Sequence, residues 1–370
     1  MANRLYYLDY LRVFLTFLVI LHHTAIAYGA GGSWIYVDVD QSELTITSIL
    51  LTLFTAVNQS FFMGLFFFLS GYFTPGAFDR KGAKMFLKER FIRLGIPLLF
   101  YVFFLGPVIY YIAHYRYQFT LLEYYQSHIL TFRQIHIGPL WFVEALLIFC
   151  FIYSLLRWLS APRSTRVLPS PAMKTLLFFA IGMGLTAFLV RFIFPVGTGV
   201  LGLQFGYFPS YIVLFTAGIL AYRGQWLNHL TPSLVKTWWR ISLVSIPLLP
   251  IVFILTGALE GNLMFEGGAN VQSFFYAIWE PFVAFGIILW LLQYFNRAWN
   301  QPTPFRTLLG QLAYTVFIIH PAVVVGFSLL LTGVDLLPLM KFVLVGFFST
   351  VTCFIIASIL IKLPYAKKIL

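Results

Sequence analysis

Residues 8–23 read LDYLRVFLTFLVILHH, which combines the composition of a membrane helix with four ionisable side chains. Asp9, Arg12, His22 and His23 stand among Leu, Phe, Val and Ile. Ionisable groups at bilayer depth cost about 2.5–3.5 kcal/mol each on insertion scales, and they usually face a bundle interior or a wet cavity. The stretch therefore predicts both a membrane-spanning helix and a functional site on that helix.

The spacing of these residues predicts a polar stripe along one face of the helix. At 3.6 residues per turn, Arg12 and His23 lie about three turns, or roughly 16 Å, apart along the axis and only about 20° apart around it. Thr16 lies near the same stripe, whereas His22 points about 80–100° away. We expect Arg12 near one membrane face, His23 deep in the membrane, and His22 as a packing neighbour.

The whole chain has the composition of an integral membrane protein. Of its 370 residues, 60% are hydrophobic and 10% are charged, against about 25% charged in ordinary soluble domains. Apolar runs of helical membrane-spanning length predict an all-α bundle of about ten transmembrane helices, forming one domain over residues 1–370. The predicted spans are 8–28, 48–72, 92–112, 139–159, 173–194, 207–222, 241–258, 273–294, 310–331 and 338–361.

Lys and Arg gather on one side of this predicted bundle. The termini and alternate connectors hold 19 of the 24 basic residues, whereas the intervening loops are acidic. By the positive-inside rule we expect cytoplasmic N- and C-termini in a multi-pass protein of the cell membrane. The net charge of +12 then reflects topology and contact with the lipid bilayer, and it gives no reason to expect nucleic acid. The 19 basic residues are Arg4, Arg80, Lys81, Lys84, Lys88, Arg90, Arg93, Arg157, Arg163, Arg166, Lys174, Arg223, Lys236, Arg240, Arg297, Arg306, Lys362, Lys367 and Lys368; the acidic ones are Asp38, Asp40, Glu43, Glu260, Glu266 and Asp335.

A second informative feature is FFFLSGYFTPG at 66–76, followed by RFIRLGIP at 90–97. Ser70 and the Gly and Pro residues after it predict an end or an unwound turn near the cytoplasmic face, with free backbone N–H groups. Arg90 and Arg93 are i and i+3, on one helical face. Two planar guanidiniums suit phosphate recognition. Basic residues also flank membrane helices routinely, so topology alone is the competing explanation.

Further polar groups lie within the predicted spans. Trp141 and Glu144 occur in GPLWFVEALL, Glu280 in WEPF, and His320 in AYTVFIIHP. We expect these four side chains to bind substrate; the open alternative is that each is a satisfied helix–helix contact, which is the commoner role of a lone His.

Known catalytic signatures are absent from the sequence. No HExxH, CxxC, P-loop or GxSxG pattern occurs, so we expect no metal site, and ATP use has no support. The two cysteines, Cys150 and Cys353, lie in apolar runs and predict no disulfide framework. A deep His without a Ser nucleophile or a metal partner fits general-base work, in which it takes a proton from a hydroxyl.

Taken in order, these segments resemble the membrane acyltransferase type 3 family. The resemblance spans nearly the whole chain and rests on LDYLR with His23 eleven residues after Arg12, FFFLSGYF, RFIRLGIP, GPLWFVEALL and AYTVFIIHP. It implies a ten-helix membrane domain that moves acyl groups, such as acetyl or succinyl, from cytoplasmic acyl-CoA to extracytoplasmic or lipid-linked acceptors, often sugars. The chain is most similar to the stand-alone, glucan succinyltransferase-like type, without an extra soluble domain.

The resemblance also implies residue roles. Arg12 and His23 match the first-span Arg and the catalytic His, with Asp9 beside them. Arg90 and Arg93 match a pair associated with the acyl donor, and we add Ser70 as a donor-side candidate from its place beside them. Acyl-CoA is then a co-substrate, no tightly bound cofactor is expected, and the acceptor is a carbohydrate or a lipid-linked glycan.

Two other function classes stay open at this point. A glycan or lipid transporter would also carry polar groups within about ten spans, but it would work without acyl-CoA. A non-catalytic membrane sensor would keep the same helical bundle while tolerating the loss of His23. The sequence does not predict the oligomeric state.

Overall fold

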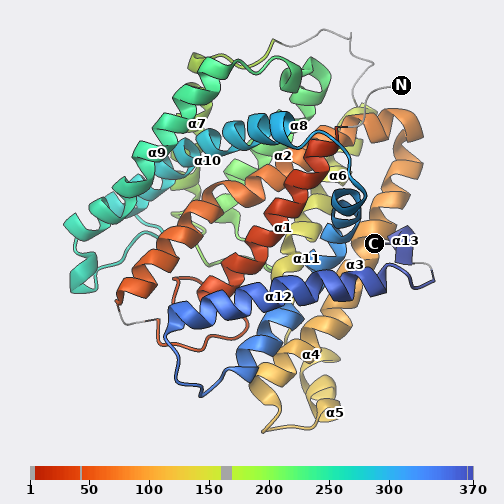
Figure 1. Ribbon diagram of the computed structural model, residues 1–370, viewed down its shortest axis with the longest axis vertical. Coiled ribbons are helices and arrows are strands. Elements are labelled where there is room, and N and C mark those ends of the chain that lie inside the picture. The colour runs from red at the N-terminus through yellow and green to blue at the C-terminus, as the bar shows by residue number, and fades with distance from the viewer. Residues whose placement is uncertain (1–4, 42–43, 160–168, 365, 370) are drawn as a thin grey trace.

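The computed structural model describes residues 5–41, 44–159, 169–364 and 366–369, and Figure 1 shows that they form a bundle of helices. The described residues contain no β-sheet, only one isolated bridge between Val200 and Leu203. The helices are α1 (Tyr6–Ala27), α2 (Ile46–Arg90), α3 (Ile96–Phe100), α4 (Gly106–Tyr110), α5 (Leu121–Tyr124), α6 (Trp141–Leu159), α7 (Met173–Val190), α8 (Phe208–Gly224), α9 (Pro232–Leu255), α10 (Val271–Ala298), α11 (Pro304–Leu330), α12 (Pro338–Leu360) and α13 (Ala366–Ile369).

The predicted all-α membrane fold is confirmed. Within the described ranges, nine helical segments are long and apolar enough to cross a membrane. Each of the ten predicted spans falls on one of them, because the second and third spans share the single run Ile46–Tyr115. The chain is therefore a multi-pass membrane protein, with its first predicted span formed as the unbroken helix α1.

The run Ile46–Tyr115 is bent at Gly82. There the backbone leaves the helical conformation, with φ 71° and ψ 166°, a region that glycine reaches at little cost. The two arms pack on each other beside the bend, where the rings of Phe78 and Phe86 lie 5.6 Å apart. Figure 1 shows the resulting corner in orange at the upper right.

The prediction that Ser70 and the Gly and Pro residues after it end or unwind the second span is wrong. α2 continues through this segment with Pro75 inside the helix, and the helical conformation is interrupted only later, at Gly82. The segment therefore offers no unwound turn to a phosphate.

Glycines in this region serve close packing between α2 and α8 instead. A Cβ atom on Gly71 would overlap the carbonyl oxygen of Phe215, and one on Gly218 would overlap the carbonyl oxygen of Phe68. Small residues let the backbones of membrane helices approach closely, and this contact supplies van der Waals energy where water exclusion cannot.

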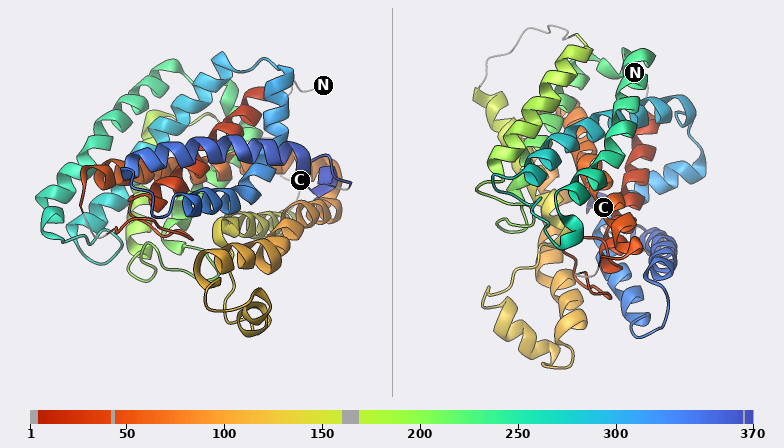
Figure 2. Two further views of the ribbon diagram at one scale, coloured as in Figure 1. Left: turned by 60° about the horizontal axis from the view of Figure 1, so that its bottom comes forward. Right: turned by 90° about the vertical axis from the view of Figure 1, so that its left-hand side faces the viewer.

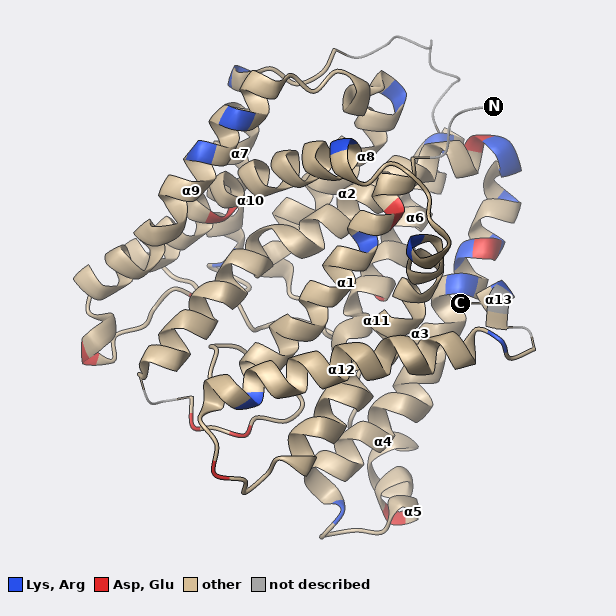
Figure 3. Cartoon of the chain, viewed as in Figure 1, with Lys and Arg blue, Asp and Glu red and all other residues tan. Residues whose placement is uncertain are grey.

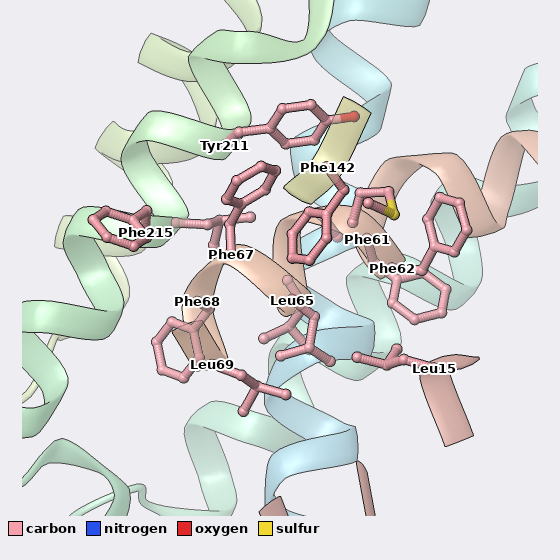
Figure 4. Packing of buried hydrophobic residues seen from close by; sticks show 14 of the residues in the cluster. Leu15, Phe61, Phe62, Leu65, Phe67, Phe68, Leu69, Phe142, Tyr211 and Phe215 are labelled. Carbon is pink, nitrogen blue, oxygen red and sulfur yellow. The ribbon is translucent and has the colours of Figure 1, made fainter. Parts of the chain in front are cut away.

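An aromatic core joins α1, α2, α6 and α8 (Figure 4). The ring of Phe67 in α2 lies 4.8 Å from the rings of both Phe142 in α6 and Tyr211 in α8. Leu15 of α1, which is fully buried, belongs to the same cluster. The first helix, which carries the ionisable residues, thus lies in the interior of the bundle, and one of its sides packs on this core.

Residues 91–137 run along the bundle and then project beyond it around α4 and α5, as Figures 1 and 2 both show. Here α3 and α4 alternate with the π-helical turns Phe91–Gly95, Tyr101–Leu105 and Tyr111–Tyr115. Pro97 and Pro107 each follow closely after a π-helical turn, and such local adjustments allow a helix to continue past a residue that lacks an N–H group.

The charged residues divide between two sides of the molecule. In Figure 3, Lys and Arg gather mainly along the upper and right-hand edges, whereas acidic residues mark the loops at the lower left. We refer to these as the basic side and the acidic side. The N-terminal end of α1 points to the basic side, and its C-terminal end, which carries His23, points away from it.

Candidate active site

His23 lies near the C-terminal end of α1 within a group of three nearly parallel rings. Its imidazole centroid is 3.9 Å from the ring of Trp34, with 15° between the planes. The imidazole of His320 in α11 lies 5.3 Å from that of His23, again at 15°. Two of the predicted site residues, far apart in the sequence, are therefore neighbours in the fold.

The three rings carry unused hydrogen-bonding atoms. His320 is fully buried, and its Nδ1 donates to the carbonyl oxygen of Phe317 at 2.6 Å, so that Nε2 carries the lone pair. Within the described residues, this Nε2, the Nδ1 of His23 and the Nε1 of Trp34 are buried without a hydrogen-bond partner. Buried polar atoms are normally paired, so the group is suited to receive a polar ligand or water.

His22 occupies a different environment from His23. It is buried and packs on the ring of Phe62 at 4.9 Å, while its own ring meets His23 edge-on at 5.4 Å. His23, by contrast, is only partly buried. The contacts of His22 are those of the predicted packing neighbour, and the reactive role of His23 stays a prediction.

Arg12 and Asp9 pair on α1, toward the basic side. Arg12 Nη1 lies 3.3 Å from Asp9 Oδ1, and the two side chains are 36% and 22% exposed, so neither is fully buried. The guanidinium also lies over the ring of Phe73 in α2, 4.5 Å from its centroid. Thr16 uses its hydroxyl within the helix, donating to the Arg12 carbonyl at 2.9 Å.

The donor-side candidates lie along the Ile46–Tyr115 run, with Ser70 before the bend at Gly82 and Arg90 and Arg93 after it. Arg90 is half-buried over the ring of Phe86, at 5.0 Å, whereas Arg93 is exposed and its carbonyl accepts from Tyr314 at 2.8 Å. Ser70 is half-buried on α2, one turn before the Phe73 ring that meets Arg12. Ser70 thus lies three residues before the α2 residue that Arg12 contacts, and Arg90 and Arg93 differ in exposure.

Trp141 faces α8, and Glu144 lies one turn further along α6. Trp141 stacks on Tyr211 at 5.5 Å and 25°, and the buried Oε2 of Glu144 has no hydrogen-bond partner among the described residues. The neighbouring Phe142 does point toward the histidines, because it meets Phe317, which in turn packs on His320. Substrate binding by Trp141 and Glu144 stays a prediction.

Glu280 is held in a buried ion pair. Its Oε2 lies 2.5 Å from Nη2 of Arg191, and the two side chains are 5% and 0% exposed, respectively. The Arg191 guanidinium also donates to the carbonyl of Gly206 and lies between the rings of Tyr207 and Tyr276, 5.1 and 5.2 Å away. The geometry favours the helix–helix contact over substrate binding for Glu280.

Sequence reasoning missed Trp34, which makes the closest ring contact with His23. The signal for it was weak, because Trp34 lies in a glycine-rich loop, GAGGSW at 29–34, and not in an apolar span. For metals, the described ranges contain no group of three or more His, Cys, Asp or Glu residues placed to hold an ion.

Comparison with known proteins assigns the family. A family model described as an acyltransferase domain matches residues 5–358, nearly the whole chain. The chain belongs to the acyltransferase-3 family. The matched residues include every candidate of this acyltransferase-3 site, from Asp9 to His320. No solved structure matches the chain.

Two relatives of this acyltransferase-3 chain carry the same name. Glucans biosynthesis protein C of Salmonella paratyphi A is 27% identical over 383 residues, covering 93% of this chain and 95% of that protein. Glucans biosynthesis protein C of Escherichia coli K12 is 39% identical over 98 residues, covering 26% of this chain. That second match spans only 24% of the length of the Escherichia coli protein.

Proposed function

We propose that this protein is an O-acyltransferase that moves an acyl group from cytoplasmic acyl-CoA to a hydroxyl of an extracytoplasmic or lipid-linked glycan. The observation that carries the proposal is the position of His23: partly buried, deep on an unbroken α1, beside unpaired polar atoms and three turns from Arg12. A neutral imidazole in such a place can accept a hydroxyl proton.

The proposed reaction is a direct transfer. The acceptor hydroxyl oxygen attacks the thioester carbonyl carbon as His23 removes the hydroxyl proton. The carbon–sulfur bond then breaks, and CoA leaves as the thiol after taking up the proton that His23 removed, which returns the imidazole to its neutral form. The length of an extended pantetheine arm is similar to the distance of about 16 Å between Arg12 and His23 along the axis of α1. A donor held at the basic side could therefore present its thioester near His23.

The proposal needs the basic side to face the cytoplasm. Cys150 and Cys353 are buried, so single cysteines introduced at exposed positions can report sidedness. In intact cells we expect Lys84→Cys to resist a membrane-impermeant thiol reagent and Asp335→Cys to react, because the positive-inside rule places them on opposite faces. The reverse labelling pattern would remove the donor assignment together with the topology.

A second prediction concerns the donor phosphates. If Arg90 and Arg93 bind them, Arg90→Lys and Arg93→Lys keep the charge but lose the planar fork. Losing one charge-assisted contact of about 1.5–3 kcal/mol should weaken acyl-CoA binding about 10- to 100-fold, measured in detergent. Arg297→Lys, another exposed arginine of the predicted cytoplasmic set, is the matched control and should bind normally. Wild-type affinity for acyl-CoA in both test variants would favour the competing explanation, in which these arginines only set the membrane topology, since the positive-inside rule counts Lys and Arg alike.

Release of free CoA by the purified protein tests the function itself. Acetyl-CoA and succinyl-CoA are the first donors to supply, and a glucan is the first acceptor because the relatives are named for glucan biosynthesis. An acyltransferase would consume the acyl-CoA and attach its acyl group to the glucan. A transporter would move glycan without consuming acyl-CoA, and a sensor would do neither.

A further inference from the structure

The segment after α1 folds back over the end of that helix and is held there by its own backbone. Gly29 and Gly32 turn the chain with φ of 120° and 142°, values suited to glycine. The Asp38 N–H then donates to the Ala27 carbonyl at 2.9 Å. Gln41 adds two bonds, from Nε2 to the carbonyls of Ile26 and Ala30.

A buried ion pair ties this segment to α12. Lys341 Nζ lies 2.6 Å from Asp38 Oδ2, and the two side chains are only 9% and 5% exposed. Tyr36 bridges the same region, since its hydroxyl donates to Asp38 Oδ1 at 3.2 Å and lies 2.6 Å from Thr332 Oγ1. Burying both charges carries a large desolvation cost, and the pair joins the segment after α1 to a helix that lies far from it in the sequence.

A third tie comes from the projecting segment 91–137. His114 Nε2 donates to the Ile35 carbonyl at 2.6 Å. The residue before Ile35 is Trp34, whose indole covers the imidazole of His23 at 3.9 Å and lies 6.1 Å from that of His320. The chain that carries this ring is therefore tied to α12 through Asp38 and to residues 91–137 through the Ile35 carbonyl.

We propose that residues 34–41 form an outer strap in which the Asp38–Lys341 pair places Trp34 on His23, making Trp34, Asp38 and Lys341 positioning residues for acyl transfer. This inference rests on the proposed function. The stacked indole holds the plane of the imidazole and keeps its reacting nitrogen directed at the acceptor hydroxyl. It also excludes water, which could otherwise attack the thioester carbonyl in place of the hydroxyl and release a free carboxylic acid and CoA.

Trp34→Ala tests the strap through the fate of the acyl group. We expect the kcat for transfer to fall about 100-fold, the effect typical of misplacing a reacting group by about 1 Å. The KM for acyl-CoA should stay unchanged, and a larger share of acyl-CoA should be lost to hydrolysis. Trp34→Phe keeps an aromatic ring on the imidazole and should retain most of the transfer rate. A wild-type ratio of transfer to hydrolysis in Trp34→Ala would overturn the proposal.

The ion pair is tested by charge reversal. Asp38→Lys and Lys341→Asp should each reproduce the Trp34→Ala behaviour, and the double variant, which restores the pair, should recover transfer. Lys81→Met breaks an exposed pair with Glu89 and is the matched control; it should leave transfer within about twofold of wild type. If the single and double variants all folded and lost acyl transfer to the same extent, the positioning role would be contradicted.

Labelling at position 23 separates the strap from the proposed function. A His23→Cys variant should react slowly with a membrane-impermeant thiol reagent while the strap is in place, and faster when Lys341→Met is added. Equal rates would overturn the strap whatever the activity. Conversely, if the wild-type protein consumes no acyl-CoA, the proposed function fails, while the labelling rates still decide whether the strap covers residue 23.

Discussion

Replacing His23 with Ala should lower acyl transfer by about 10²–10⁴-fold, the usual contribution of a general base. The imidazole is partly buried against Trp34 and His320, and no other histidine of α1 offers a partly exposed ring. Donor affinity should change little, because the phosphates are proposed to bind Arg90 and Arg93, at the basic side and not beside His23. The transfer rate and acyl-CoA binding are both measurable on the purified protein.

His22→Ala is the matched control for this prediction. His22 is buried against Phe62, so its removal should cost packing energy and some stability but far less activity. Both variants should migrate as folded protein in size-exclusion chromatography. If His22→Ala abolished transfer and His23→Ala retained it, the assignment of the base would be reversed.

Removing one partner of the Arg191–Glu280 pair should destabilise the protein by about 3–5 kcal/mol, because the other charge is left buried and unpaired. Both side chains are at least 95% buried. Glu280→Met and Arg191→Met should each lower the thermal unfolding midpoint in detergent, whereas the double variant, which removes both charges, should recover much of the stability.

The exposed Lys81–Glu89 pair again supplies a control. Lys81→Met should change stability by less than about 1 kcal/mol, as expected for a surface ion pair. The experiment also decides the role of Glu280, which the sequence predicts as substrate-binding. A Glu280→Met variant as stable as wild type, but impaired in acceptor binding, would restore the substrate role and contradict the structural one.

The membrane-spanning helices could be predicted from the sequence because apolar runs of fixed length have few alternatives in a bilayer. The bend could not. Gly and Pro around Ser70 resembled helix breakers, yet α2 passes through them, since neighbouring helices stabilise such residues inside a membrane. The actual bend is at Gly82, in a hydrophilic stretch where glycine carries no distinctive pattern.

The candidate site was predictable where it lies on one helix. Helical periodicity places Arg12 and His23 on one stripe of α1, and the unbroken helix Tyr6–Ala27 agrees with that spacing. Periodicity does not say which helices face one another. The contacts of His23 with His320 and of Asp38 with Lys341 each join residues about 300 positions apart, and only the tertiary fold brings them together.

The most direct test of the account is vectorial transfer by the purified protein in liposomes. Labelled acetyl-CoA or succinyl-CoA is supplied on the side of the basic residues and a glucan on the opposite side. The account predicts that wild-type protein places label on the glucan and releases CoA, whereas His23→Ala does neither at a comparable rate. Equal labelling by wild type and His23→Ala, or no consumption of either donor by the wild-type protein, would contradict it.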